Sequence, residues 1–93
     1  MKLRFYIDPE TKEPHILRHG VSEDEAQEVL ARPLEDRPGE GDSRVALGQT
    51  QGGHYLRVVY VPDTEPDSVF VIIGYDLGPK AMRALRRRRR RKP

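Results

Sequence analysis

The sequence predicts a small α+β domain in which about four strands form an antiparallel or mixed sheet, in the element order β-α-α-β-β-β-α. Three observations predict this class. One strand-like run opens the chain, a well-marked helix start follows it, and three strand-like runs separated by turn residues fill the second half. With 93 residues, of which 35% are hydrophobic, the chain has the size of one domain with one modest core.

The first elements are expected to be a strand over residues 2–7 and a helix over residues 23–31. Apolar and polar residues alternate in the first run, at the two-residue period of a half-buried strand. The connection over residues 9–19 can hold at most a broken helix, because a proline stands in its middle. Ser22 and Glu25 then have the spacing of a capping box, which predicts where the helix begins.

The second half predicts a loop, three strands and a last helix. Residues 33–43 hold two Pro, two Gly and four acidic residues with a single Leu, so they predict a surface loop. Residues 44–50, 55–61 and 69–75 read as strands joined by turns, in the manner of antiparallel hairpins. The third of these runs is apolar at consecutive positions, so we expect it in the middle of the sheet. The last helix is expected to begin after Gly78.

The predicted core collects the apolar positions that keep a consistent period within these elements. They are Leu3, Phe5, Ile7, Val29, Leu30, Leu47, Val58, Val69, Val71 and Ile73.

Charge divides the chain into two parts. Residues 86–92 carry seven positive charges, which leaves 10 Lys and Arg (17 − 7) against 15 Asp and Glu in residues 1–85, a net charge of −5. We therefore expect one domain over residues 1–85 and a basic tail over residues 86–93. Such asymmetry predicts that the tail is the part that meets a polyanion.

Six consecutive arginines make up most of this tail and are the predicted RNA-binding residues. They are Arg86, Arg87, Arg88, Arg89, Arg90 and Arg91. On a helix they would project in all directions, so they must be either solvated or neutralised by acidic groups. Two alternatives to nucleic acid stay open: a solvated tail, and a tail folded back on the acidic residues of the predicted helix, which are Glu23, Asp24, Glu25 and Glu28. No aromatic residue interrupts the run, which argues against base stacking, so we expect any binding to be sequence-tolerant.

Several short patterns resemble, in their order, the BrnT-type toxins, a family of the RelE-like ribonuclease superfamily. The matching residues are Arg18-His19-Gly20-Val21-Ser22 with Glu25-Ala26, then Ala46-Leu47-Gly48, Val58-Val59-Tyr60, Ile72-Ile73, and Arg83, Arg86 and Arg87 in the last helix. The family usually has a basic residue just after its fourth strand, where this chain has Gly74-Tyr75-Asp76. Its first helix is uninterrupted and basic, whereas here Pro9 and Pro14 flank two glutamates.

The resemblance implies a RelE/BrnT-like fold and two alternative functions. The first is a metal-independent endoribonuclease, the toxin of a toxin-antitoxin pair, held inactive by a cognate antitoxin. The second is a non-catalytic BrnT-like protein that uses its basic tail to bind RNA, the ribosome or a protein partner, including a second copy of itself. The acidic residue at Asp76 favours the second function, and the basic last helix favours the first.

Cleavage of the RelE kind needs a base for the 2′-hydroxyl, cations for the pentavalent phosphate and a donor for the leaving 5′-oxygen. The candidate catalytic residues are His54, Arg57, Tyr75, Lys80 and Arg83. Arg57 and Tyr60 alternate on one strand, so at most one of them can belong to the site. Each candidate also has an ordinary interpretation, such as a half-buried tyrosine or a solvent-facing arginine on a strand.

No cofactor, metal site or membrane span is expected. The chain has no Cys, which excludes disulfides and thiolate metal sites. His15 and His19 stand four residues apart, but no third ligand is evident and Ile16 occupies the place of a zinc-protease glutamate. No signal peptide and no run of 18 apolar residues is found, so a cytoplasmic protein is expected.

Overall fold

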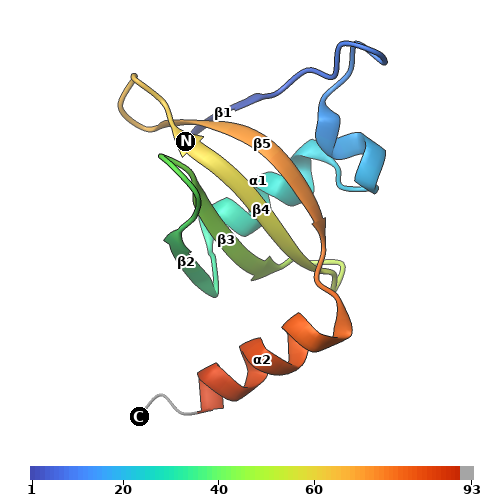
Figure 1. The fold of residues 1–93 in the computed structure, drawn as a ribbon, viewed down its shortest axis with the longest axis vertical. Helices are drawn as coiled ribbons and strands as arrows, with labels where there is room; N and C mark the ends of the chain where they lie inside the picture. Colours follow the sequence, from blue (N-terminus) through green and yellow to red (C-terminus); the bar gives the residue numbers. More distant parts are fainter. Residues whose placement is uncertain (91–93) are drawn as a thin grey trace.

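The computed structural model describes residues 1–90, which form a five-stranded mixed sheet with an α-helix behind it and another below the strand ends (Figure 1). The elements are β1 (Lys2–Phe5), a 3₁₀ turn η1 (His15–His19), α1 (Glu23–Ala31), β2 (Glu35–Pro38), β3 (Arg44–Gln49), β4 (Tyr55–Pro62), β5 (Ser68–Asp76) and α2 (Pro79–Arg90). The α+β class predicted from the sequence is confirmed. The described residues hold five strands rather than about four, and the first predicted helix is a 3₁₀ turn.

The strands lie in the order β1-β5-β4-β3-β2. β1 runs parallel to β5, and the other neighbours are antiparallel. β5 therefore lies between β1 and β4, as its continuous apolar run predicts. β1 pairs only with the first part of β5, from Ser68 to Val71. The rest of that edge is covered by η1, which packs against β5 (Figure 1).

The prediction of a loop over residues 33–43 is wrong in its first part, because β2 forms there. β2 pairs with β3 along the edge of the sheet, where Asp36 lies opposite Ala46. The Asp36 carboxylate accepts a 2.6 Å hydrogen bond from the Tyr60 hydroxyl and a 3.0 Å bond from Arg44 Nε. Acidic composition disfavours ordering when a segment has no partners. Here Tyr60 and Arg44 supply them, and a proline at the end of an edge strand is compatible with pairing.

The helix start predicted from Ser22 and Glu25 is confirmed. The Ser22 hydroxyl accepts a hydrogen bond from the Glu25 amide, and the Glu25 carboxylate accepts one from the Ser22 amide, both at 3.1 Å. α1 buries Ala26 and Val29 against the sheet. The close approach needs a glycine, because a Cβ on Gly48 would lie 3.1 Å from a Val29 methyl carbon.

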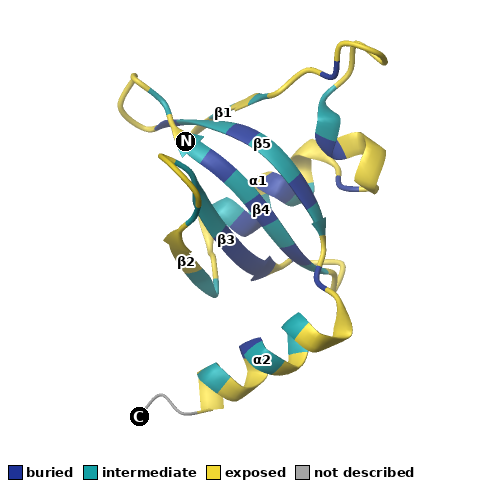
Figure 2. Cartoon of the chain, viewed as in Figure 1, coloured by how far each residue is buried: buried dark blue, intermediate teal, exposed yellow. Residues whose placement is uncertain are grey.

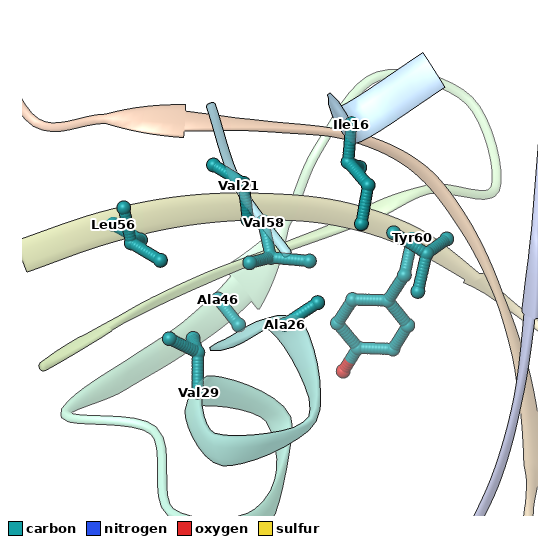
Figure 3. Packing of buried hydrophobic residues seen from close by; sticks show 9 residues of the cluster. Ile16, Val21, Ala26, Val29, Ala46, Leu56, Val58 and Tyr60 are labelled. Atoms are coloured by element: carbon teal, nitrogen blue, oxygen red, sulfur yellow. The ribbon is translucent and has the colours of Figure 1, made fainter. Parts of the chain in front are cut away.

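The main core fills the space between the sheet, α1 and η1 (Figure 3). Its buried residues are Ile16, Val21, Ala26, Val29, Ala46, Leu56, Val58, Tyr60 and Val71. Of the predicted core, Val29, Val58 and Val71 are confirmed here, and Leu3, Phe5, Leu30 and Val69 pack partly buried against this cluster. Leu47 is buried on the opposite face of the sheet.

Two predicted core residues are wrong. Ile7 is 50% exposed, because the chain leaves the sheet after Phe5 and Ile7 makes only an isolated bridge with Pro14. Ile73 lies on the face away from α1, because a register shift in the β4–β5 pairing inserts one extra residue. This β-bulge moves Val71 and Ile73 to opposite faces, although their spacing in an ideal strand would keep them together.

α2 lies below the strand ends (Figure 2) and packs against sheet residues that face away from α1. Leu85 is 1% exposed and packs in a second cluster with Leu47 and Leu77. Ala81 precedes Leu85 by one helical turn and packs against the same cluster. The helix is thus held by a short apolar stripe, with basic residues around it.

The basic tail predicted over residues 86–93 is helical as far as Arg90 and is partly docked on the domain. Arg88 makes a bidentate ion pair with Glu35 of β2, in which Nε and Nη2 donate to the two carboxylate oxygens at 2.7 Å and 2.8 Å. Arg89 donates a 3.0 Å hydrogen bond to the Leu34 carbonyl. Within residues 86–90 the tail therefore does turn back on an acidic residue, which belongs to β2 and not to α1.

Candidate nucleic-acid interface

A cationic groove lies between α2 and the face of the sheet that α1 does not cover. Its volume is about 440 Å³, and Leu47 and alanines of α2 form its apolar part. Four basic side chains from three elements line it, namely Arg37 of β2, Arg57 of β4, and Lys80 and Arg88 of α2. Cations from separate elements that converge on one hollow create a field that attracts anions.

Arg57 is the most enclosed of these cations. Its Nη1 donates to the Tyr75 hydroxyl at 3.4 Å, and its Cζ lies 5.8 Å from the centre of the Tyr75 ring. Its Nε is shielded from solvent and has no hydrogen-bond acceptor within residues 1–90.

Arg88 differs from the other groove cations because Glu35 neutralises it. The hydrogen bonds to that carboxylate are the main cause that raises the pKa of the Arg88 guanidinium above its ordinary value. Arg37, Arg57 and Lys80 make no ion pair with a carboxylate of residues 1–90. The uncompensated charge of the groove therefore comes from these three side chains.

The outer side of α2 carries a second group of cations. Arg83, Arg86, Arg87 and Arg90 surround a shallow hollow of about 300 Å³, and all four are exposed. None of them forms an ion pair within the described part of the chain. The predicted RNA-binding residue Arg91 lies outside the described residues. α2 thus presents positive charge both into the groove and away from it.

The structure brings some of the predicted catalytic residues together and separates others. Arg57, Tyr75 and Lys80 lie at or beside the groove. Arg83 lies in the hollow on the outer side of α2. His54 is remote from them, because its Nδ1 lies 3.0 Å from Glu25 Oε2 of α1.

Tyr60 and Arg57 do point to opposite faces, as their alternation predicts. Tyr60 is buried in the core with α1, and Arg57 lines the groove. Sequence reasoning missed Arg37, because it stands in the stretch predicted as an acidic loop. The sequence holds one weak indication of its position. Arg37 lies two residues after Glu35, so the two side chains share a face if the segment is a strand.

A buried carboxylate fixes η1 beside β5. Asp8 is 4% exposed and accepts hydrogen bonds from Arg18 Nη1 at 2.9 Å and from the Glu10 amide at 2.8 Å. His15 Nδ1 lies 3.1 Å from the same carboxylate. The bond from Arg18, followed by that from the Glu10 amide, holds the pKa of Asp8 well below its usual range.

This depressed pKa predicts a pH dependence of stability. A carboxyl group with a lowered folded-state pKa stabilises the fold above its unfolded-state pKa of about 4, and loses that contribution as the pH falls below this value. Asp8→Asn is therefore expected to be less stable than wild type at pH 7, with a difference that shrinks below pH 4. Urea unfolding between pH 7 and pH 2 measures it. Asp42→Asn, at an exposed loop position, is the control and should follow wild type; an Asp8→Asn deficit that persists unchanged at pH 2 would contradict the assignment.

The described residues contain no group of three or more His, Asp or Glu side chains arranged to hold a metal ion. His15 Nδ1 faces Asp8, and the rings of His15 and His19 meet edge to face at 5.3 Å. Of the helices within residues 1–90, none has the length and apolar character needed to cross a lipid bilayer.

A scan against protein-family models, a search of curated proteins and a search of solved structures find no match for this chain. Function is accordingly inferred from the groove, from α2 and from the residues themselves.

Proposed function

We propose that this protein binds RNA, with phosphates held in the cationic groove and along α2. The observation that carries the proposal is the convergence of Arg37, Arg57 and Lys80, without carboxylate partners within residues 1–90, on one groove. A phosphate in this groove can accept charge-assisted hydrogen bonds from the guanidinium and ammonium groups that line it. The exposed arginines of α2 extend the positive surface beyond the groove.

A second candidate is a RelE-like endoribonuclease, the toxin of a toxin-antitoxin pair, as the BrnT resemblance implies. The observation that favours it is the contact between Arg57 and Tyr75 beside Lys80. The two cations can stabilise a pentavalent phosphate, and the tyrosine hydroxyl can give a proton to the leaving oxygen. His54, another candidate catalytic residue, is engaged by Glu25 away from the groove. Binding therefore has fuller support than cleavage, and a cognate antitoxin belongs to this second candidate only.

The groove is tested by replacing two of its cations, Arg57 and Lys80, with alanine and measuring the affinity for a labelled single-stranded RNA against salt. Each phosphate that is no longer bound should lower the slope of log K against log salt by about 0.7, so the double variant should lose about 1.4. Arg32→Ala, which removes one charge at the end of α1, is the matched control and should leave the slope unchanged. Equal slopes for all three proteins would contradict the groove as the binding site.

The enzymatic candidate has a separate readout. If it holds, wild-type protein should cleave RNA in the presence of a chelator and arrest growth on induced expression, and Tyr75→Ala or Lys80→Ala should abolish both effects without unfolding the domain. Intact RNA with wild-type protein that nevertheless binds it would leave the binding function alone.

A further inference from the structure

Four aromatic side chains from three parts of the chain form a row beside β5. Tyr6 follows β1, His15 and His19 belong to η1, and Tyr75 lies near the end of β5. Successive ring centres are 6.0 Å apart from Tyr6 to His15, 5.3 Å from His15 to His19 and 6.3 Å from His19 to Tyr75. The row ends at the groove, because Tyr75 contacts Arg57.

The backbone holds this row in place. The Tyr6 amide donates a 2.8 Å hydrogen bond to the Val71 carbonyl of β5, and the His15 amide donates a 2.9 Å bond to the Tyr6 carbonyl. The chain between them folds over the buried Asp8 carboxylate, which also faces His15 Nδ1. Figure 1 shows η1 beside the part of β5 that β1 leaves uncovered. The rings are therefore presented on a fixed support.

Two of the four rings are open to solvent. Tyr6 is 41% exposed and His19 is exposed, while the His15 side chain is 26% exposed and Tyr75 is half-buried. Neighbouring rings meet at 71° and 73° along the first two steps. Because they meet edge to face, the rings do not cover one another's faces by parallel stacking.

We propose that Tyr6 and His19 stack bases of single-stranded RNA whose phosphates run into the cationic groove. This inference rests on the proposed RNA binding and names its substrate as single-stranded. Aromatic rings beside a positive groove are the arrangement by which proteins hold unpaired strands, since every base offers a flat face. A duplex keeps its bases stacked inside and cannot present them to the row.

The rings have no counterpart in the arginine run, which contains no aromatic residue. Their separation in sequence hides them, since Tyr6 and Tyr75 lie at opposite ends of the chain. In this proposal the arginines of the tail bind phosphates, and the rings of the row bind bases.

The test compares two labelled strands of equal length and charge, one an oligoadenylate and the other the same backbone with abasic residues. Wild-type protein should prefer the strand with bases by at least about tenfold, since stacking is worth a factor of about five or more for each base. Tyr6→Leu and His19→Leu should each reduce this ratio about fivefold, and Tyr6→Phe should keep it. Leu17→Ala, at a 41% exposed position of η1 outside the row, is the control and should keep the wild-type ratio.

The outcomes separate this inference from the proposed function. Equal affinity of the wild-type protein for both strands would overturn the base-stacking role and leave phosphate binding intact. Failure of both strands to bind would overturn both proposals. A duplex of the same sequence that binds as tightly as the single strand would also overturn the assignment to unpaired RNA. Circular dichroism of each variant confirms that the fold is kept.

Discussion

Removing residues 86–93 is expected to lower the affinity for RNA by at least about a hundredfold at 0.1 M salt. Residues 86–92 carry seven positive charges, and the remainder carries a net charge of −5. Binding of each phosphate by the tail releases counterions, which at about 0.7 per phosphate makes binding by the full chain steeply dependent on salt. The truncated protein should therefore bind weakly and with a much flatter salt dependence.

A helix-preserving variant separates charge from structure in this experiment. Replacing Arg86, Arg87 and Arg90 by Gln removes exposed charge and keeps Arg88 on Glu35. It should lose a large part of the affinity with no loss of stability. The truncation should cost about 1 kcal/mol of stability, because it removes a partly exposed ion pair. Equal RNA binding by truncated and full-length chains would show that the tail is a solvated or intramolecular appendage.

Leu85→Ala is expected to lower the free energy of unfolding by about 3 kcal/mol, the usual cost of a cavity at a buried leucine. Leu85 is 1% exposed and is the one fully buried residue of α2, so the loss falls on the contact between helix and sheet. In a domain of this size about 1 kcal/mol corresponds to about 4–8 °C in melting temperature. Thermal unfolding should therefore shift by more than about 10 °C.

Hydrogen exchange gives a second readout for Leu85→Ala. Amides of α2 should exchange faster while those of β4 and β5 stay protected, because α2 is docked by few apolar contacts and can open on its own. Arg87→Ala, at an exposed position of the same helix, should change the free energy of unfolding by less than about 0.5 kcal/mol. Unchanged melting and unchanged exchange in α2 for Leu85→Ala would mean that Leu85 does not hold the helix.

Local patterns predicted those parts of the fold that local interactions determine. The capping box at Ser22 is complete within four residues, and the strand in the middle of the sheet is marked by its own apolar run. β2 depends instead on Tyr60 and Arg44, which its own sequence cannot show. The face of Ile73 depends on one extra residue in the pairing between two strands, and neither strand alone reveals that shift.

The sequence predicted some residues of the candidate site but not their arrangement. Arg57, Tyr75 and Lys80 could be proposed from residue type, because cations and hydroxyls suit phosphate chemistry. Their position around one groove depends on where α2 docks, which is set by Leu85 and by the ion pair from Arg88 to Glu35. Arg37 could not be found without knowing that its segment is a strand.

The parallel pairing of β1 with β5 has a consequence for synthesis. Lys2 pairs with Ser68 and Phe5 with Val71, so β1 has no strand partner until β5 has been synthesised. Pairing of residues so distant in sequence slows folding, because a long loop must close first. On a translating ribosome the hairpin of β3 and β4 can form early, whereas β1 stays unpaired until β5 has emerged. The arginines of α2 follow β5 directly, so the sheet closes at about the moment when the cationic helix leaves the exit tunnel.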